Sequence, residues 1–158
     1  MAVTESTGWA TARSAAFASA FNYGCIEIYD GVQPATPDLP ANGVLLGRIT
    51  VNGGAWTPGM SANGLRFISA GRYAIKDPQQ TWVLVGLGTG TARSFRLRAN
   101  PPDTGGPSST ALRLDGAIGL VDDVGTVDAQ MFLPSTAITP ATSLEINNWW
   151  YAVPPIGD

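Results

Sequence analysis

The chain has 158 residues, of which 44% are hydrophobic, so it is long enough for one domain with a buried core. Its net charge of −3 comes without a basic run, and no apolar run approaches the roughly 20 residues of a membrane span, which argues against nucleic acid and membrane as partners. Only 13% of residues are charged, about half the usual share, a composition that fits either a protein living inside an assembly or a compact β domain with long polar loops.

Residues 1–8 are polar and predict an N-terminal arm, followed by a single domain over 9–158. No basic segment precedes a continuous apolar core, so we expect no signal peptide and synthesis in a cytoplasm. The one good helix candidate runs from Trp9 to about Phe21, with Ser6 or Thr7 as its cap.

One face of this predicted helix carries a side chain at every fourth position, namely Trp9, Arg13, Phe17 and Phe21. The stripe is apolar except for Arg13. It can pack on the domain's own sheet or dock on a partner. Asn22 and Gly24 are expected to end the helix.

The pattern then changes to the period of two that is typical of strands. Strands are expected at 25–29, 44–51, 65–69, 73–76, 81–87, 93–99, 111–114, 126–133 and 143–152. Short strands separated by Gly, Asn and Pro turns, one of them at Asp115-Gly116, predict an all-β fold. We expect an antiparallel β-sandwich of jelly-roll type with one short N-terminal helix.

Two loops stand out by composition. Residues 32–43 contain three prolines, which favour an extended, rigid segment. Residues 100–109 are rich in Pro, Gly and Ser and are expected to be the most mobile segment, able to reach outward. Between them, Arg93, Arg96 and Arg98 form a weak basic patch that favours a solvated face or ion pairs.

The chain has no histidine and one cysteine, so a Ser–His–Asp triad, a Cys–His pair and a His/Cys zinc site are excluded. Cys25 lies in a predicted strand and is expected to be a buried, inert thiol. Asp122 and Asp123 are best interpreted as a turn, although a carboxylate pair for hydrolysis or a Ca²⁺ ligand set remains open. We therefore expect no enzyme, no catalytic residue, no metal and no cofactor.

Three aromatic residues lie in a row near the C-terminus. In a strand, Trp149 and Tyr151 share one face and Trp150 takes the other. The alternatives are a central strand buried on both faces, a protein interface, or a sugar-binding surface.

Several segments resemble small structural proteins of tailed bacteriophages. Residues 26–35 (IEIYDGVQPA) with 45–50 (LLGRIT) resemble the "ISGxQPA … GxLL" stretch of these proteins. Residues 90–97 (GTARSFRL) are similar to their "GTAxxFR" strand, and 114–119 (LDGAIG) to their "DGxVG" turn and strand. These matches follow the same order along most of the chain.

The resemblance implies a capsid cement, or decoration, protein that binds the major capsid protein lattice of a virion, as a dimer or trimer on the shell. The segments 1–8 and 32–43 are the expected clamps. The interface candidates are Trp9, Gln33, Pro34, Pro37, Leu39, Pro40, Trp149 and Tyr151. The alternative is a tail, neck or tail-tip component, including a module that binds host glycans through the aromatic strand.

Overall fold

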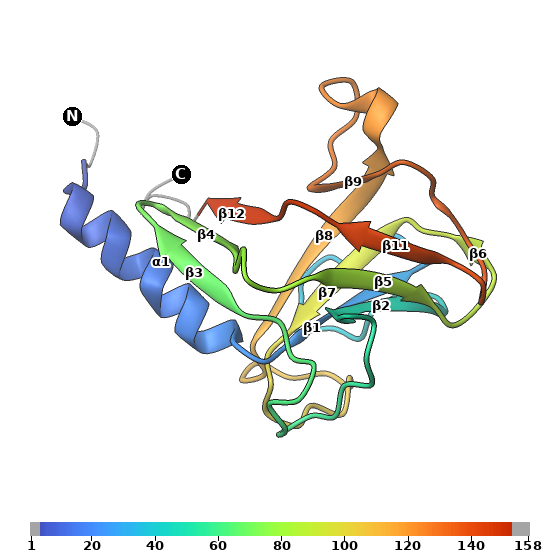
Figure 1. Ribbon diagram of the computed structural model, residues 1–158, viewed down its shortest axis with the longest axis horizontal. Coiled ribbons are helices and arrows are strands. Elements are labelled where there is room, and N and C mark those ends of the chain that lie inside the picture. Colours follow the sequence, from blue (N-terminus) through green and yellow to red (C-terminus); the bar gives the residue numbers. More distant parts are fainter. Residues whose placement is uncertain (1–3, 153–158) are drawn as a thin grey trace.

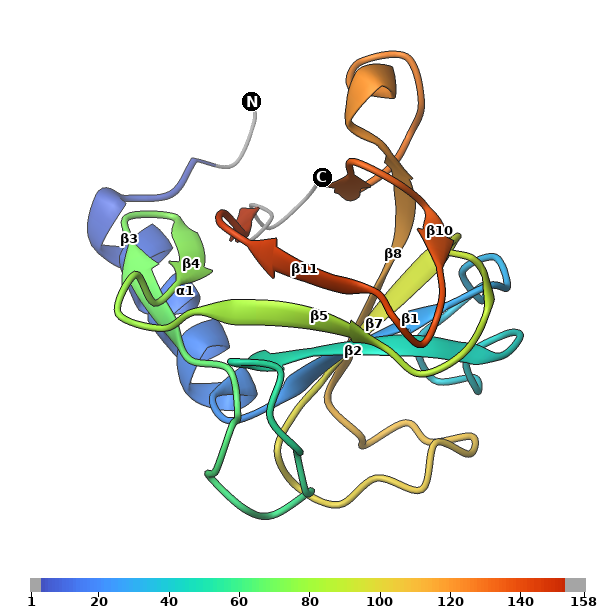
Figure 2. The same ribbon diagram turned by 45° about the vertical axis from the view of Figure 1, so that its right-hand side comes forward.

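A seven-stranded sheet curls around the core of the structure, a computed structural model that describes residues 4–152 (Figures 1 and 2). In spatial order its strands are β11 (Ser143–Ile146), β5 (Trp82–Gly86), β2 (Leu45–Val51), β1 (Cys25–Tyr29), β7 (Ser94–Arg98), β8 (Arg113–Leu120) and β9 (Met131–Leu133). Neighbouring strands are antiparallel except for β8 and β9, which run parallel. The prediction of a mostly β chain with one short helix is confirmed.

Two smaller sheets complete the fold. One has three antiparallel strands in the order β12 (Trp150–Ala152), β4 (Tyr73–Lys76) and β3 (Phe67–Ala70), and the other pairs β10 (Ala137–Ile138) with β6 (Gly90–Thr91). The prediction of a single strand over 143–152 is wrong. Residues 147–149 leave the large sheet after β11, and the chain enters the three-stranded sheet as β12.

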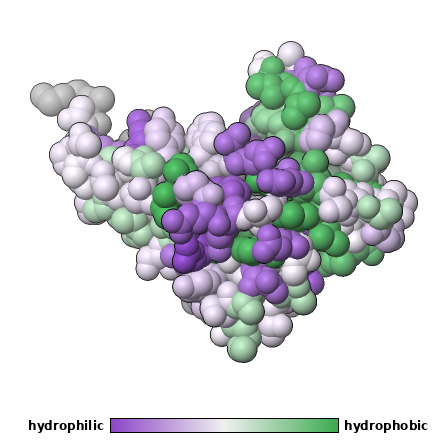
Figure 3. All heavy atoms as spheres, viewed as in Figure 1, coloured by the Kyte–Doolittle hydropathy of each residue, from purple (hydrophilic) through white to green (hydrophobic). Residues whose placement is uncertain are grey.

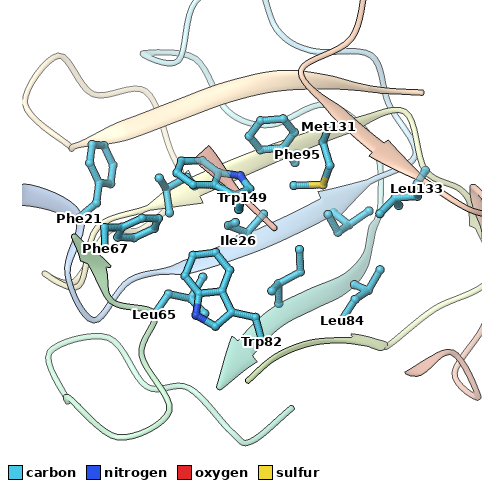
Figure 4. Close-up of a cluster of buried hydrophobic side chains, with 14 of the residues drawn as sticks. Phe21, Ile26, Leu65, Phe67, Trp82, Leu84, Phe95, Met131, Leu133 and Trp149 are labelled. Atoms are coloured by element: carbon cyan, nitrogen blue, oxygen red, sulfur yellow. The ribbon is translucent and has the colours of Figure 1, made fainter. Parts of the chain in front are cut away.

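The inner face of the curled sheet is apolar (Figure 4). Ile26 of β1 lies opposite Ile49 of β2 and Leu97 of β7, and all three side chains are fully buried. Aromatic rings fill the end next to the small sheet, where Phe67 meets Trp82 at 5.3 Å and Trp149 at 5.1 Å between ring centroids. Each such side chain contributes about 1.5–3 kcal/mol by leaving water.

The helix α1 (Thr7–Phe21) begins inside the predicted arm. Its cap is Ser6, whose hydroxyl accepts a hydrogen bond from the Trp9 amide. Glu5 forms a salt bridge with Arg13 at 2.6 Å, so residues 5–8 are tied to the helix and do not form a free clamp. Residues 1–3 of the predicted arm lie outside the described residues.

The predicted stripe on this helix is only half correct. Phe21 is buried and Phe17 packs against the core, but Trp9 is 50% exposed. The packed face instead includes Ser14 and Ala18. Ser14 is fully buried, and its hydroxyl donates to the carbonyl of Gly71, in the turn between β3 and β4, which offsets the cost of burying a polar group.

The predicted turn at Asp115-Gly116 is wrong, because both residues lie inside β8. A Cβ on Gly116 would lie 2.4 Å from the ring of Phe95, so this glycine makes room for an aromatic neighbour rather than turning the chain. The predicted strand over 126–133 shrinks to β9, and residues 120–128 form a projection with a 3₁₀ turn, Val121–Asp123 (Figure 1).

Candidate functional site

The outer face of the large sheet carries a row of alternating charges. Glu27 of β1 lies between Arg48 of β2 and Arg96 of β7, and Arg96 lies opposite Asp115 of β8. The same strands bear apolar side chains at the intervening positions, which face the core. Arg48 is 37% exposed, but the other three side chains, Glu27, Arg96 and Asp115, are at most 3% exposed and are not solvated.

Arg96 connects this row to the proline-rich loop. Its guanidinium donates two hydrogen bonds of 2.7 Å to the carboxylate of Asp115 and a third, of 2.8 Å, to the carbonyl of Leu39. Such a two-point pair fixes the orientation of both side chains. The 32–43 loop is therefore held against the sheet by a buried arginine.

A second arginine holds both loops. Arg113 of β8 lies directly opposite Arg98 of β7, a repulsive pair that Asp103 of the 100–109 loop relieves. Arg113 donates to the Asp103 carboxylate at 2.5 and 2.7 Å, and also to the carbonyl of Pro37 at 3.0 Å. These hydrogen bonds lower the pKa of Asp103 to about 2.

The prediction that 100–109 is the most mobile segment and reaches outward is not supported by these contacts. Asp103 is held by Arg113, and the amide of Ser108 donates to the carbonyl of Asp38 in the other loop. The two loops thus cover the charged row together. Of the predicted basic patch, Arg96 and Arg98 form ion pairs, which was one of the two expectations, and beneath these loops Arg96 is buried and Arg98 is half-buried.

The interface candidates in the 32–43 loop divide by exposure. Pro34 is buried and Pro37 is half-buried, so these two prolines shape the loop and offer little surface. Gln33, Leu39 and Pro40 are exposed, Leu39 by 43%. We call the exposed residues of this loop, including Val32 at 62%, the loop surface.

A second surface lies on the three-stranded sheet. Residues that face away from α1 are apolar on all three strands, namely Ile68, Ala70, Tyr73, Ile75, Trp150 and Ala152. We call this set the sheet face. Trp150 is 64% exposed and Tyr73 42%, and their rings meet edge to face at 5.7 Å. Exposed aromatic and aliphatic side chains gathered on one face are typical of an interaction site.

Trp149 and Tyr151 lie on the other side of β12 and offer little surface to a partner. Trp149 is 9% exposed and belongs to the core, and Tyr151 is half-buried against Phe17 at 4.8 Å. The alternation of the three aromatics was predicted correctly, but Trp150, which was not among the candidates, is the exposed member. The apolar residues at alternating positions in 68–75 were the signal that could have identified it.

The remaining reactive groups behave as follows. Cys25 is fully buried, and burial raises the pKa of its thiol to about 12, which confirms the prediction of a buried thiol. Asp122 and Asp128 are exposed, and Asp123 is half-buried. Within residues 4–152, no group of three or more Asp, Glu, Cys or His side chains is placed to hold a metal ion.

No known protein family matches this chain, and no curated protein matches it. Among residues 4–152, no helix has the length and apolar character needed to cross a membrane.

Proposed function

We propose that this chain is a non-enzymatic virion structural protein, a capsid cement protein that binds and stabilises the lattice of the major capsid protein. The observation that carries the proposal is the loop surface, whose exposed Val32 and Leu39 are presented by a loop that the buried Arg96 and Arg113 hold in place. A loop ordered before binding loses little conformational freedom on contact, so more of its burial energy appears as affinity. The motif resemblance to tailed-phage proteins supports the same function.

The mechanism requires no reaction. Each copy would bury a few apolar side chains of the loop surface against a capsid subunit, a weak contact by itself. Repetition across an ordered shell raises the effective concentration of each contact, so the overall avidity for the shell becomes high. The place of action would be the virion surface, after synthesis in the host cytoplasm. We also propose that the fold is a sandwich of jelly-roll type, which is the fold expected of capsid cement proteins.

Replacing Leu39 by Ser tests the loop surface. If Leu39 is covered by a capsid subunit, the variant should bind empty shells roughly tenfold more weakly, since burying a leucine is worth about 1.5–3 kcal/mol. Co-sedimentation with purified shells measures the occupancy. Leu87→Ser is the matched control, because Leu87 is 52% exposed in a different loop. Equal occupancy of the two variants would remove the loop surface from the proposal.

A second candidate is a tail, neck or tail-tip component that binds host glycans. It is favoured by a hollow of about 490 Å³ beside Trp150, whose lining includes Tyr73, Asn147 and Asn148. An aromatic wall with amide groups suits a sugar ring, which offers an apolar face and hydroxyls. Quantitative mass spectrometry of purified particles separates the candidates, because a cement protein is present in hundreds of copies and a tail component in a handful.

A further inference from the structure

The projection formed by residues 120–128, which we call the tip, exposes apolar side chains away from the rest of the protein. Val121, Val124 and Val127 are 45–60% exposed, and Leu120 is 36% exposed. In Figures 1 and 2 the tip stands clear of the sheets, and Figure 3 shows hydrophobic and hydrophilic residues side by side on it. The chain thus presents a protruding apolar tip that the rest of residues 4–152 does not cover.

Hydrogen bonds within the tip give it a defined shape. The amide and the hydroxyl of Thr126 both donate to the carbonyl of Asp123, at 2.9 and 2.8 Å, and Val124 forms a bridge with Val127. Gly125 supplies the positive φ of 85° that closes the turn. A protrusion that is ordered before contact suits insertion into a preformed surface.

Unpaired charges are distributed unevenly between the tip and the sheet face. Six carboxylates within residues 4–152 form no salt bridge, and three of them, Asp122, Asp123 and Asp128, lie in the tip. Three cations in the same range form none, and two of them, Arg72 and Lys76, lie within or directly beside β4. The tip is therefore apolar with a negative rim, and Arg72 gives the sheet face a positive charge at its edge. Lys76 lies on the opposite side of β4, across from Phe67, and its ammonium donates to the carbonyls of Gln80 and Asp77.

We propose that the tip of one copy docks on the sheet face of a second copy of this chain. The valines would cover Trp150 and Tyr73, and the aspartates would lie near Arg72. Complementary rims of this kind favour the matched orientation and accelerate encounter. The contact goes beyond capsid binding, because it joins copies of the chain through surfaces other than the loop surface.

This contact is head-to-tail, since the two surfaces are different parts of the molecule. A contact of this type closes into a ring where the rotation between copies permits and otherwise propagates. It also makes a prediction that a symmetric face-to-face contact does not make. Two variants, each missing one half of the contact, should restore it when they are mixed.

The experiment uses the full chain with Val124→Ser, which weakens the tip, and Trp150→Ser, which weakens the sheet face. Both residues are exposed, by 60% and 64%, and circular dichroism with thermal melting checks the fold. Val44→Ser and Leu87→Ser are the matched controls, at 61% and 52% exposure. Should Trp150→Ser not fold, Tyr73→Ser replaces it. Analytical ultracentrifugation measures association.

We expect the unaltered chain and both controls to associate with the same affinity. Each test variant alone should associate more weakly by a factor of roughly ten or more. An equimolar mixture of the two test variants should regain affinity but stop at two copies, since only one intact tip and one intact face remain. Added salt should weaken the contact.

Several results would overturn the proposal. They are a chain that stays monomeric up to about 1 mM, a Val124→Ser variant that associates normally, a mixture that does not recover, or no effect of salt. Binding of a glycan with a change in Trp150 fluorescence, in a monomeric chain, would assign the sheet face to carbohydrate instead. None of these results depends on whether Leu39 contacts the shell. The self-association proposal and the capsid-binding proposal can therefore fail independently.

Discussion

Replacing Arg96 by Ala should be among the most damaging single changes in this protein. The substitution removes both hydrogen bonds to Asp115 and leaves that carboxylate, 1% exposed, without its counter-charge. Removing one partner of a buried pair typically costs about 3–5 kcal/mol, because the remaining charge stays desolvated. The carbonyl of Leu39 loses its donor as well, so the 32–43 loop should loosen.

Urea titration and thermal melting measure the loss of unfolding free energy. For a chain of this length, about 1 kcal/mol corresponds to roughly 2–4 °C, so the midpoint should fall by roughly 6–20 °C. Arg48→Ala is the matched control. Arg48 is 37% exposed and lies 3.3 Å from Glu27, which keeps Arg98 and Tyr29 as partners, so its loss should cost about 1 kcal/mol or less.

A double change separates the ion pair from the loop. Arg96→Met with Asp115→Leu replaces both charges by apolar groups, which is often nearly neutral for stability. The Leu39 carbonyl still lacks its donor, so amide hydrogen exchange in the loop should quicken while global stability is kept. If Arg96→Ala lowered the free energy of unfolding no more than Arg48→Ala does, the buried pair of Arg96 and Asp115 would not hold the 32–43 loop against the sheet.

Three further outcomes are expected. Trp149→Ala should cost about 3–5 kcal/mol by emptying part of the core, whereas Trp150→Ala should cost less than about 1 kcal/mol; equal costs in urea titration would contradict the assigned faces. The pKa of Asp103 is about 2 in the folded protein, so as the pH falls this carboxylate is protonated in the unfolded chain before it is protonated in the folded one. Its contribution to the free energy of unfolding is therefore complete above about pH 4 and is lost as the pH falls towards 2. Asp103→Asn should flatten acid unfolding in that window, and an unchanged profile would refute the assignment. Cys25, with its raised pKa and full burial, should react with a disulfide reagent only when the protein unfolds, and rapid labelling of the folded chain would show otherwise.

The sequence by itself determined the local structure of this protein. The alternation at 25–29 gave the strand β1 with its residue bounds, and the capping residue before Trp9 located the helix to within two residues. Both signals are local, since they depend on side-chain period and on capping by neighbouring residues. For the same reason, the buried thiol of Cys25 followed from its place in an apolar strand.

The tertiary structure alone decided which faces became surface. Gly116 looked like a turn because a glycine gives no local sign of the Phe95 ring that it accommodates from another strand. The sequence left the arginines at 96 and 98 either solvated or ion-paired, because only strand register brings Glu27 and Asp115 beside them and two distant loops above them. The alternation puts Trp149 and Trp150 on opposite sides of the chain. Which of the two sides meets the core is decided by contacts between residues far apart in the chain.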